Sequence, residues 1–249
     1  MNDQSSFYKF RLREWPRRAS DIQAYMDPTF ATIAARYDFM TRAMSFGLEQ
    51  GWKKKAVNFI PRKHEPGRVL DLACGTGDFP LHLRAAGFSA PIFGLDRNPG
   101  MLKISKEKCA AAKPVSFVQA DLTAIPLKER SFNVITMGYA LRYVVDIRRT
   151  LTDVFRLLDR GGIFVCLDFG VPTNRLYRRL CFGYLFLLGS LWGWLIHGNA
   201  DTYWHIVESL KAYPGQGAVA AWLKEVGFEK IVMREQLGGI IAIVSATRP

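Results

Sequence analysis

The sequence predicts an α/β fold with a doubly wound, mostly parallel sheet. Short apolar runs alternate with stretches of helical spacing between residues 68 and 168, a rhythm that is typical of parallel βαβ units. Several of these apolar runs end in an acidic residue or in glycines. Because ligands of such sheets bind at the carboxyl ends of the strands, these acids and glycines are candidate functional residues.

The same rhythm predicts the order of the elements. In chain order, we expect strand 68–73, helix 80–86, strand 91–95, helix 101–112, strands 115–119 and 132–137, helix 148–158, strand 162–167, helix 217–226 and strands 228–234 and 240–246. The last two strands come after the alternation has stopped, so we expect them to close the sheet in antiparallel orientation. The sheet then has seven strands.

Segments outside the alternation predict the domain organisation. Residues 1–20 are polar and basic and predict a flexible arm, and residues 21–249 predict a single domain. Apolar residues at helical spacing predict a helical cap over residues 21–62, with breaks near Pro28 and near residues 45–47. Residues 172–214 are rich in leucine and aromatic residues and predict a helical lid.

Composition limits the class of protein. Hydrophobic residues make up 49% of the 249 residues and charged residues 22%, which supplies a core and argues against disorder. The four cysteines form no C-x-x-C pair and the first 20 residues lack an apolar signal, so we expect a cytoplasmic protein. The four histidines have no metal-ligand spacing, so no metal is expected. The net charge of +12 favours nucleic acid, anionic membrane or acidic ligands as partners.

The central motif is Val69-Leu-Asp-Leu-Ala-Cys-Gly-Thr-Gly-Asp78, in which an apolar strand runs into Gly75 and Gly77. Glycine permits positive φ and lets the backbone approach a ligand closely. Asp96 follows Gly75 by 21 residues at the end of the next predicted strand, where a carboxylate can accept both hydroxyls of a ribose. The pattern therefore predicts a nucleoside-containing cofactor.

Three details favour S-adenosylmethionine over a nicotinamide dinucleotide. The third glycine of the dinucleotide fingerprint is Pro80 in this chain. Asp71 and Asp78 flank the loop, where carboxylates would repel a pyrophosphate and attract the ammonium of a methionyl group. Asp121 and Leu122 end the following strand and can bracket an adenine between a carboxylate and an apolar side chain.

Four segments resemble class I methyltransferases, whose Rossmann-like fold has a seven-stranded, mostly parallel sheet with helices on both faces. They are Asp71–Asp78, Gly94–Leu102, residues 119–127 with Gln119-Ala-Asp-Leu and Ala124-Ile-Pro-Leu, and Arg156-Leu-Leu-x-x-Gly-Gly162. More narrowly, the chain resembles the family that C-methylates polyprenyl quinols in ubiquinone and menaquinone synthesis. That likeness rests on Tyr37-Asp-Phe-Met-x-x-x-Met-Ser45 with Trp52-Lys53, on residues 203–216 and on Gly238-Gly-Ile-x-Ala242, and it covers residues 25–246.

The resemblance implies S-adenosylmethionine as cofactor and assigns candidate site residues. Those expected around the cofactor are Asp71, Gly75, Thr76, Gly77, Asp96, Arg97, Asp121, Leu122 and Gly138. Arg142 and Tyr37 are expected near the reacting carbon and are the candidate catalytic residues. A ring carbon becomes nucleophilic when a neighbouring hydroxyl loses its proton, so the Arg142 guanidinium would stabilise the anion and the Tyr37 hydroxyl would bind the ring oxygen.

Positions expected near the substrate depart from the family pattern more than cofactor positions do. The family has asparagine where this chain has Thr41, histidine where it has Glu49, and commonly asparagine where it has Tyr143. Its Lys-Pro-Gly-Gly turn is Asp159-Arg-Gly-Gly162 here, and its Glu-x-Ser is Asp168-Phe-Gly170. Two acceptors therefore stay open: a polyprenyl quinol (demethylmenaquinol or a demethoxy-type benzoquinol) and another small phenolic or secondary metabolite.

Residues 180–196 form an apolar run of 17 residues without a charge. A spanning helix needs about 20 residues, and a crossing here would split the domain, so we do not expect a transmembrane helix. Two interpretations remain: a buried lid helix, or a lid that also touches an anionic membrane at the inner face. Arg175, Arg178 and Arg179 favour the second.

Two further classes of function are disfavoured. A nucleic-acid methyltransferase would place an Asn/Asp-Pro-Pro-aromatic tetrapeptide after the strand 132–137, where this chain has Gly138-Tyr-Ala-Leu-Arg142, so no nucleic-acid partner is expected. A non-enzymatic binder is disfavoured because the cofactor loop is intact. A homodimer is left open.

Overall fold

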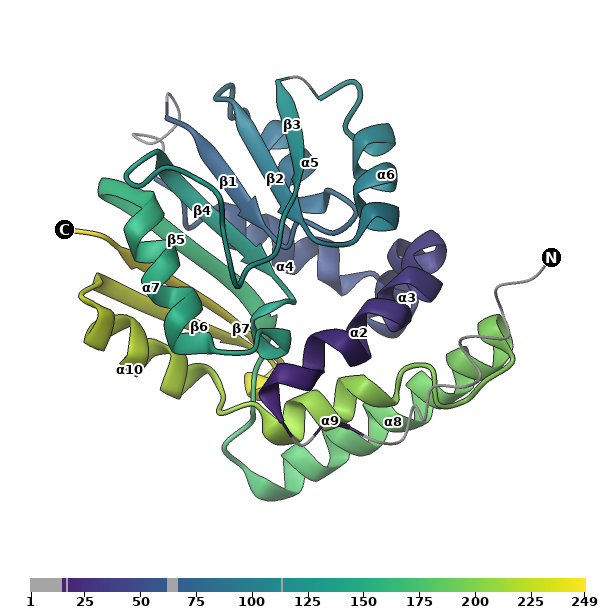
Figure 1. Cartoon of the computed structure of the whole chain (residues 1–249). Helices are drawn as coiled ribbons and strands as arrows, with labels where there is room; N and C mark the ends of the chain where they lie inside the picture. The colour runs from purple at the N-terminus through teal and green to yellow at the C-terminus, as the bar shows by residue number, and fades with distance from the viewer. Residues whose placement is uncertain (1–14, 17, 62–66, 113) are drawn as a thin grey trace.

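A seven-stranded sheet with the strand order β3-β2-β1-β4-β5-β7-β6 forms the centre of the protein (Figure 1). The computed structural model describes residues 15–16, 18–61, 67–112 and 114–249, so most of the predicted arm over residues 1–20 lies outside the described residues. The strands are β1 (Val69–Leu72), β2 (Ile92–Asp96), β3 (Val115–Gln119), β4 (Phe132–Gly138), β5 (Leu158–Phe169), β6 (Glu229–Gln236) and β7 (Ile241–Thr247). Strands β1 to β5 pair in parallel, and β7 runs antiparallel to β5 and β6, which confirms the predicted sheet.

Helices cover both faces of the sheet and the carboxyl ends of its parallel strands (Figure 1). They are α2 (Ala19–Ile33), α3 (Tyr37–Met44), α4 (Leu48–Val57), α5 (Asp78–Ala85), α6 (Pro99–Lys108), α7 (Ile147–Leu157), α8 (Arg175–His197), α9 (Trp204–Ala212) and α10 (Gln216–Val226). Short 3₁₀ turns lie at η1 (Ala34–Arg36), η3 (Leu141–Tyr143) and η4 (Leu237–Gly239).

Side chains that point alternately to the two faces of the sheet form two apolar cores, one on each face. Val69, Val134 and Val165 face one side of the sheet, where they pack with buried residues of α4 and α5. Their neighbours Leu70 and Ile135 face the other side, where they pack with α7 and α10. Because successive strand residues point to opposite faces, the near-continuous apolar runs of the sequence fill both layers.

Helix α2 continues through Pro28, so the predicted break there was wrong. Proline removes one backbone donor from a helix interior. The turn is nevertheless held by packing of the buried Tyr25, Met26 and Ile33, and the Thr29 hydroxyl donates to the carbonyl of Tyr25 at 3.1 Å. The second predicted break is confirmed, because α3 ends at Met44 and α4 begins at Leu48.

The inserted segment folds back on the N-terminal helices. Helices α2, α3, α8 and α9 gather at the carboxyl ends of β1, β4 and β5 (Figure 1). The Tyr184 hydroxyl donates to the carbonyl of Met44 at 3.1 Å, and Arg36 donates to the carbonyl of Ile196 at 2.9 Å. A Cβ on Gly193 would lie 2.6 Å from the carbonyl oxygen of Asn199, so glycine there permits close approach of the chain that leads into α9.

Helix α8 is mostly exposed, contrary to the interpretation of a buried lid helix. Its 23 residues make it long and apolar enough to cross a membrane by length and composition, and only 17% of its most apolar window is buried. The buried face carries Leu185, Gly189 and Gly193. The opposite face carries an exposed apolar stripe, formed by Leu176, Leu180, Leu187, Leu191, Trp194 and Leu195.

Candidate functional site

The loop between β1 and α5 is built from residues with left-handed backbone. Ala73, Gly75 and Gly77 have φ of 51°, 52° and 85°, a region that favours glycine. A Cβ on Gly77 would lie 2.9 Å from the Cys109 sulfur, whereas one on Gly75 would meet no atom within 4 Å. Gly77 is thus needed for packing as well as for its backbone conformation, and Gly75 leaves the loop open to an approaching ligand.

Asp96 connects this loop to the end of β2. Its carboxylate accepts hydrogen bonds from the backbone amides of Gly75 and Asn98, both at 2.8 Å. Burial raises the pKa of Asp96, and the two amide hydrogen bonds oppose that rise. The carboxylate is therefore fixed in orientation, and its remaining lone pairs can accept from a ligand.

A first cavity of about 120 Å³ opens at the carboxyl ends of β1, β2 and β4. Six residues predicted for the site lie in its wall: Tyr37, Gly75, Asp96, Arg97, Leu122 and Gly138. Helix α2 covers the cavity with Gln23, Met26 and Phe30. The wall combines one buried carboxylate with apolar side chains from Leu95, Met101 and Leu122.

The other predicted cofactor residues lie close to this wall but outside it. Asp71 is buried, and the Thr136 hydroxyl donates to it at 2.6 Å; burial raises the pKa of Asp71 to about 8. Asp121 lies 3.5 Å from Arg97 and accepts from Gln23 at 3.2 Å. Thr76 and Gly77 belong to the loop itself and are not in the wall.

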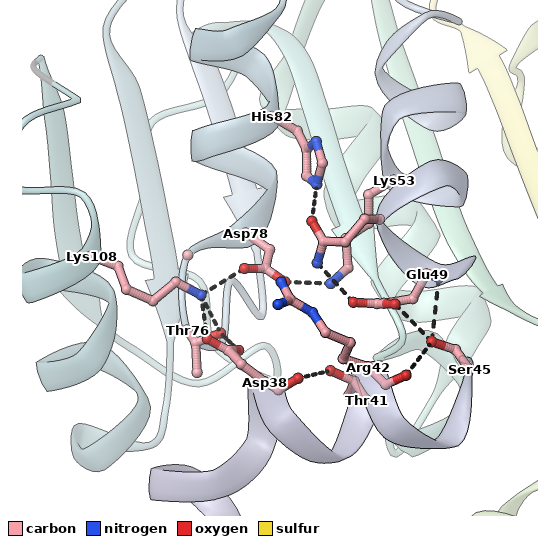
Figure 2. A network of polar contacts seen from close by, with 12 residues as sticks. Asp38, Thr41, Arg42, Ser45, Glu49, Lys53, Thr76, Asp78, His82 and Lys108 are labelled. Carbon is pink, nitrogen blue, oxygen red and sulfur yellow. Dashed lines mark hydrogen bonds and ion pairs between the residues drawn. The ribbon is translucent and has the colours of Figure 1, made fainter. Parts of the chain in front are cut away.

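A polar network joins the loop to the N-terminal helices (Figure 2). Asp78 accepts from Lys53 of α4 and from Lys108 of α6, the latter at 2.6 Å. Although burial acts to raise the pKa of Asp78, the two ammonium groups lower it to about 2. Asp38 of α3 accepts from both Thr76 and Lys108 at 2.5 Å. The charge of Asp78, which the sequence suggested would attract an ammonium group, is therefore balanced within the protein.

A second cavity of about 390 Å³ adjoins the first. It lies among α3, α4, α8, α9 and the start of β7, and most of its wall is apolar. Four residues line both cavities: Phe30, Tyr37, Tyr139 and Tyr143. The two cavities thus share these four aromatic residues, so ligands in each could meet beside these rings.

Arg142 lies in the wall of the second cavity and not of the first. Its guanidinium pairs with the buried Asp168 and donates to the Tyr143 hydroxyl at 2.8 Å and to the Ser209 hydroxyl at 3.2 Å. Although burial disfavours its charge, Tyr143 and Asp168 keep the pKa of Arg142 above its usual value. A permanent cation is therefore held at the edge of an apolar cavity.

Two further polar groups line the second cavity. Glu49 accepts from the Ser45 hydroxyl at 2.7 Å and from Gln50 at 2.8 Å; burial acts to raise its pKa, but these hydrogen bonds and Lys53 lower it. Burial lowers the pKa of His205 to about 3, so its ring is neutral. Its Nδ1 lies 3.1 Å from the carbonyl of Thr202, so Nδ1 carries the proton and Nε2 is an acceptor.

Sequence reasoning did not assign Tyr139, Asp168 or His205 to the site. His205 shares no metal-ligand spacing with the other histidines, and Tyr139 belongs to the segment Gly138–Arg142 that follows a predicted strand. The position of Asp168 at the end of β5 was the one available signal, because other strand ends had already supplied site residues. Within the described part of the chain, no group of three His, Cys, Asp or Glu residues is placed to hold a metal.

Comparisons with known proteins agree with this geometry. The model of the ubiE/COQ5 methyltransferase family matches residues 19–248. The ubiquinone/menaquinone biosynthesis C-methyltransferase UbiE of Methylobacterium nodulans is 35% identical over 231 residues, which is 90% of each chain. The demethylmenaquinone methyltransferase of Desulfitobacterium hafniense is 34% identical over 234 residues, or 92% of each chain.

Solved structures share the fold at low identity. A SAM-dependent methyltransferase of Thermotoga maritima superposes with a TM-score of 0.63 at 16% identity, covering 90% of this chain and all of the other. A Haemonchus contortus phosphoethanolamine N-methyltransferase, in complex with S-adenosyl-L-methionine, superposes with a TM-score of 0.55 at 14% identity, covering 78% of this chain and 52% of the other.

The wall of the first cavity carries side chains of the kinds that bind S-adenosylmethionine. The fixed Asp96 carboxylate can accept both ribose hydroxyls, and Leu95, Met101 and Leu122 offer an apolar surface for the adenine. The open backbone at Gly75 permits close approach of the methionyl part. With the family model matching 230 residues from 19 to 248 and relatives at 34–35% identity over nine-tenths of the chain, this S-adenosylmethionine-dependent methyltransferase belongs to the ubiE/COQ5 methyltransferase family.

Proposed function

We propose that this enzyme methylates a ring carbon of a demethylated polyprenyl quinol in respiratory quinone biosynthesis. The observation that carries the proposal is the second cavity, which is apolar, adjoins the cofactor cavity and has one buried cation in its wall. An aromatic ring with an ionisable hydroxyl and an apolar tail matches that wall. The names of the M. nodulans and D. hafniense relatives support the same acceptor class.

S-adenosylmethionine supplies an electrophilic methyl group. The residues of this chain then have to bind the acceptor ring, favour its anion and keep water away from the reacting atoms. Arg142 favours ionisation of the ring hydroxyl, because its cation lies in an apolar cavity where charge is weakly screened. Tyr37 lines both cavities, and burial raises its pKa, so its hydroxyl stays protonated and donates to the ring oxygen.

The remaining predicted cofactor residues have supporting roles in this proposal. Asp96 binds the ribose, and Leu122 and Arg97 lie beside the adenine. Gly75 leaves room for the backbone to approach the donor, and Gly138 makes room for the Phe79 ring beside the cavity wall. Asp71, Thr76, Gly77 and Asp121 keep the loop and its rim in place through the contacts described above. In the same scheme, residues 21–249 act as one domain, with residues 21–62 as its cap and residues 172–214 as its lid.

A second candidate is methylation of another small phenolic acceptor. The observation that favours it concerns the departures from the family pattern. Thr41, Glu49 and Tyr143, three of the residues at which the family has other side chains, all line the second cavity. Because these departures lie in the wall of the cavity proposed to hold the acceptor, they favour an acceptor whose ring, or whose ring substituents, differ from those of the family's quinols.

Incubation with methyl-labelled S-adenosylmethionine and a panel of acceptors tests the function. The panel contains demethylated benzoquinols and naphthoquinols in anionic vesicles, together with soluble phenols. We expect label on a ring carbon of a quinol, and label in the naphthoquinol alone would assign the enzyme to menaquinone synthesis. Label in a soluble phenol but in neither quinol would replace the quinol by the second candidate.

The exposed stripe of α8 is proposed to lie on an anionic membrane at the cytoplasmic face. Leu187, Leu191 and Trp194 are exposed, and the basic residues Arg175 and Arg179 precede them on the same exposed helix. Basic residues beside an exposed apolar stripe are complementary to anionic lipid. Leu180 and Tyr184 line the second cavity from the same helix, so a polyprenyl tail could pass from the bilayer into the cavity.

Leu187→Glu/Leu191→Glu should reduce binding to anionic vesicles by about tenfold or more, because each leucine contributes roughly 1.5 kcal/mol or more on burial. Neither residue lines a cavity, so the folded protein should be unchanged. Met233→Glu on the exposed side of β6 is the matched control and should bind as the parent does. Vesicle sedimentation at low and high salt measures this. A parent dimer that the double variant makes monomeric would assign the stripe to a second copy instead.

A further inference from the structure

Tyr139 occupies the boundary between the two cavities. It directly follows Gly138 at the carboxyl end of β4, and it is one of the four aromatic residues that line both cavities. If the first cavity holds the methyl donor and the second the acceptor ring, the methyl group crosses between them beside this residue. The inference below therefore rests on the proposed function.

Two unfavourable features fall on this one residue. The backbone of Tyr139 has φ of 57°, a left-handed conformation that a bulky side chain rarely adopts. It is held there by a hydrogen bond from its amide to the carbonyl of Leu167 at 2.7 Å. In addition, its hydroxyl is buried and has no hydrogen-bond partner among the described residues. Strain and an unsatisfied polar group together indicate a residue retained for a ligand.

The surroundings of Tyr139 determine what its hydroxyl can bind. Burial raises its pKa well above the usual value; the neighbouring groups of Tyr37, Asp168 and Glu49 act in the same direction, and Arg142 opposes them. The hydroxyl therefore keeps its proton and acts as a donor. The Arg142 guanidinium donates to the carbonyl oxygen of Tyr139 at 3.3 Å. An oxygen anion near this residue would therefore also be stabilised by the positive charge of Arg142.

We propose that the Tyr139 hydroxyl is a further catalytic residue, which donates a hydrogen bond to the ionised ring oxygen of the acceptor. The ring hydroxyl first loses its proton to water, and Tyr139 keeps its own. As the new carbon–carbon bond forms, the carbon–sulfur bond breaks and its electron pair stays on sulfur. The ring carbon then loses its hydrogen as a proton to water, and the electron pair of that carbon–hydrogen bond restores the aromatic ring.

Tyr139→Phe separates this role from a structural one. A hydrogen bond to an anion is worth roughly a tenfold to hundredfold change in equilibrium or rate, so we expect kcat/KM to fall by that factor. The melting temperature should stay the same or rise, because the variant removes a buried hydroxyl that has no partner. In the pH profile of kcat, which reports the bound acceptor, the acid limb should move to higher pH, because the acceptor anion loses a hydrogen-bond donor. A purely structural hydroxyl would lower the melting temperature and leave the pH profile in place.

A turnover-independent measurement uses 4-nitrophenol, whose anion is coloured. The parent enzyme should bind 4-nitrophenolate and lower the apparent pKa of the bound phenol, and Tyr139→Phe should bind it about tenfold or more weakly. Tyr213→Phe is the matched control, because Tyr213 is buried but lines neither cavity. Equal nitrophenolate affinity and equal pH profiles in the parent and Tyr139→Phe would overturn the proposal. If the parent bound nitrophenolate more tightly than Tyr139→Phe but methylated no quinol, only the proposed quinol acceptor would be refuted.

Discussion

Asp96→Asn should weaken the binding of S-adenosylmethionine by about 100-fold. The Asp96 carboxylate already accepts two backbone hydrogen bonds of 2.8 Å, from Gly75 and Asn98, and still has lone pairs for the ribose. An asparagine keeps one acceptor oxygen and turns its amide donor toward a backbone donor. Hydrogen bonds to a charged group contribute about 1.5–3 kcal/mol each, and 1.4 kcal/mol is a tenfold change in affinity. Isothermal titration calorimetry measures the effect.

Asp121→Asn is the matched control for this experiment. Asp121 also ends a strand region beside the cofactor cavity, but it lies outside the wall and pairs with Arg97 and Gln23. We expect its change to weaken cofactor binding by less than about tenfold, as for a partly exposed ion pair. A loss equal to that of Asp96→Asn would mean that Asp121 reaches the adenine. Unchanged affinity in Asp96→Asn would remove Asp96 from the ribose site.

The sheet could be predicted from sequence because its signals are local. Each strand is a short apolar run, and the glycines after β1 mark the turn into α5. The boundary of β5 was less predictable: the strand begins at Leu158 and not at residue 162. Leu158 pairs with Phe132, and the register then shifts before Val134 pairs with Ile163. Pairing through the Asp159–Gly162 turn depends on the neighbouring strand, which local spacing does not reveal.

In helix α2 the local signal was present but misleading. Local propensity disfavours a helix through Pro28, and the sequence therefore predicted a break. Burial of Tyr25, Met26 and Ile33 against the rest of the protein outweighs the loss of one backbone hydrogen bond. For a related reason the sequence left open whether α8 is buried or exposed, because an apolar run alone does not distinguish a buried helix from an exposed one.

The meeting of the candidate site residues could be predicted where they lie at strand ends. Gly75, Asp96 and Gly138 lie at or just after the carboxyl ends of β1, β2 and β4, so their meeting follows from the topology of a parallel sheet. The partners of these residues come from distant segments. Lys53 and Lys108 meet at Asp78 from two different helices, and Asp168 reaches Arg142 across 26 residues. Whether a tyrosine hydroxyl finds a partner, as for Tyr139, is decided only by the folded packing.

Arg142→Ala should lower kcat by about 10²–10³-fold and leave cofactor affinity within about twofold. That factor is typical for removal of one group that stabilises a developing or full oxygen anion. Cofactor binding should survive because Arg142 lines the second cavity and not the first. Single-turnover methyl transfer measures the first quantity, and calorimetry with S-adenosylmethionine measures the second. Unchanged turnover would remove Arg142 from the chemistry.

Arg142→Ala also breaks the salt bridge to Asp168, so a second variant is needed to separate the loss of activity from a loss of stability. Both side chains are almost fully buried, and removing one partner of a buried ion pair costs about 3–5 kcal/mol of unfolding free energy. Arg142→Gln/Asp168→Asn replaces the pair by two neutral groups that can still hydrogen-bond. If the cation is what the reaction needs, this variant should recover most of the lost stability and remain as inactive as Arg142→Ala. If activity returned together with stability, Arg142 would be a structural residue, and Tyr37 and Tyr139 would be left as the groups that bind the ring oxygen.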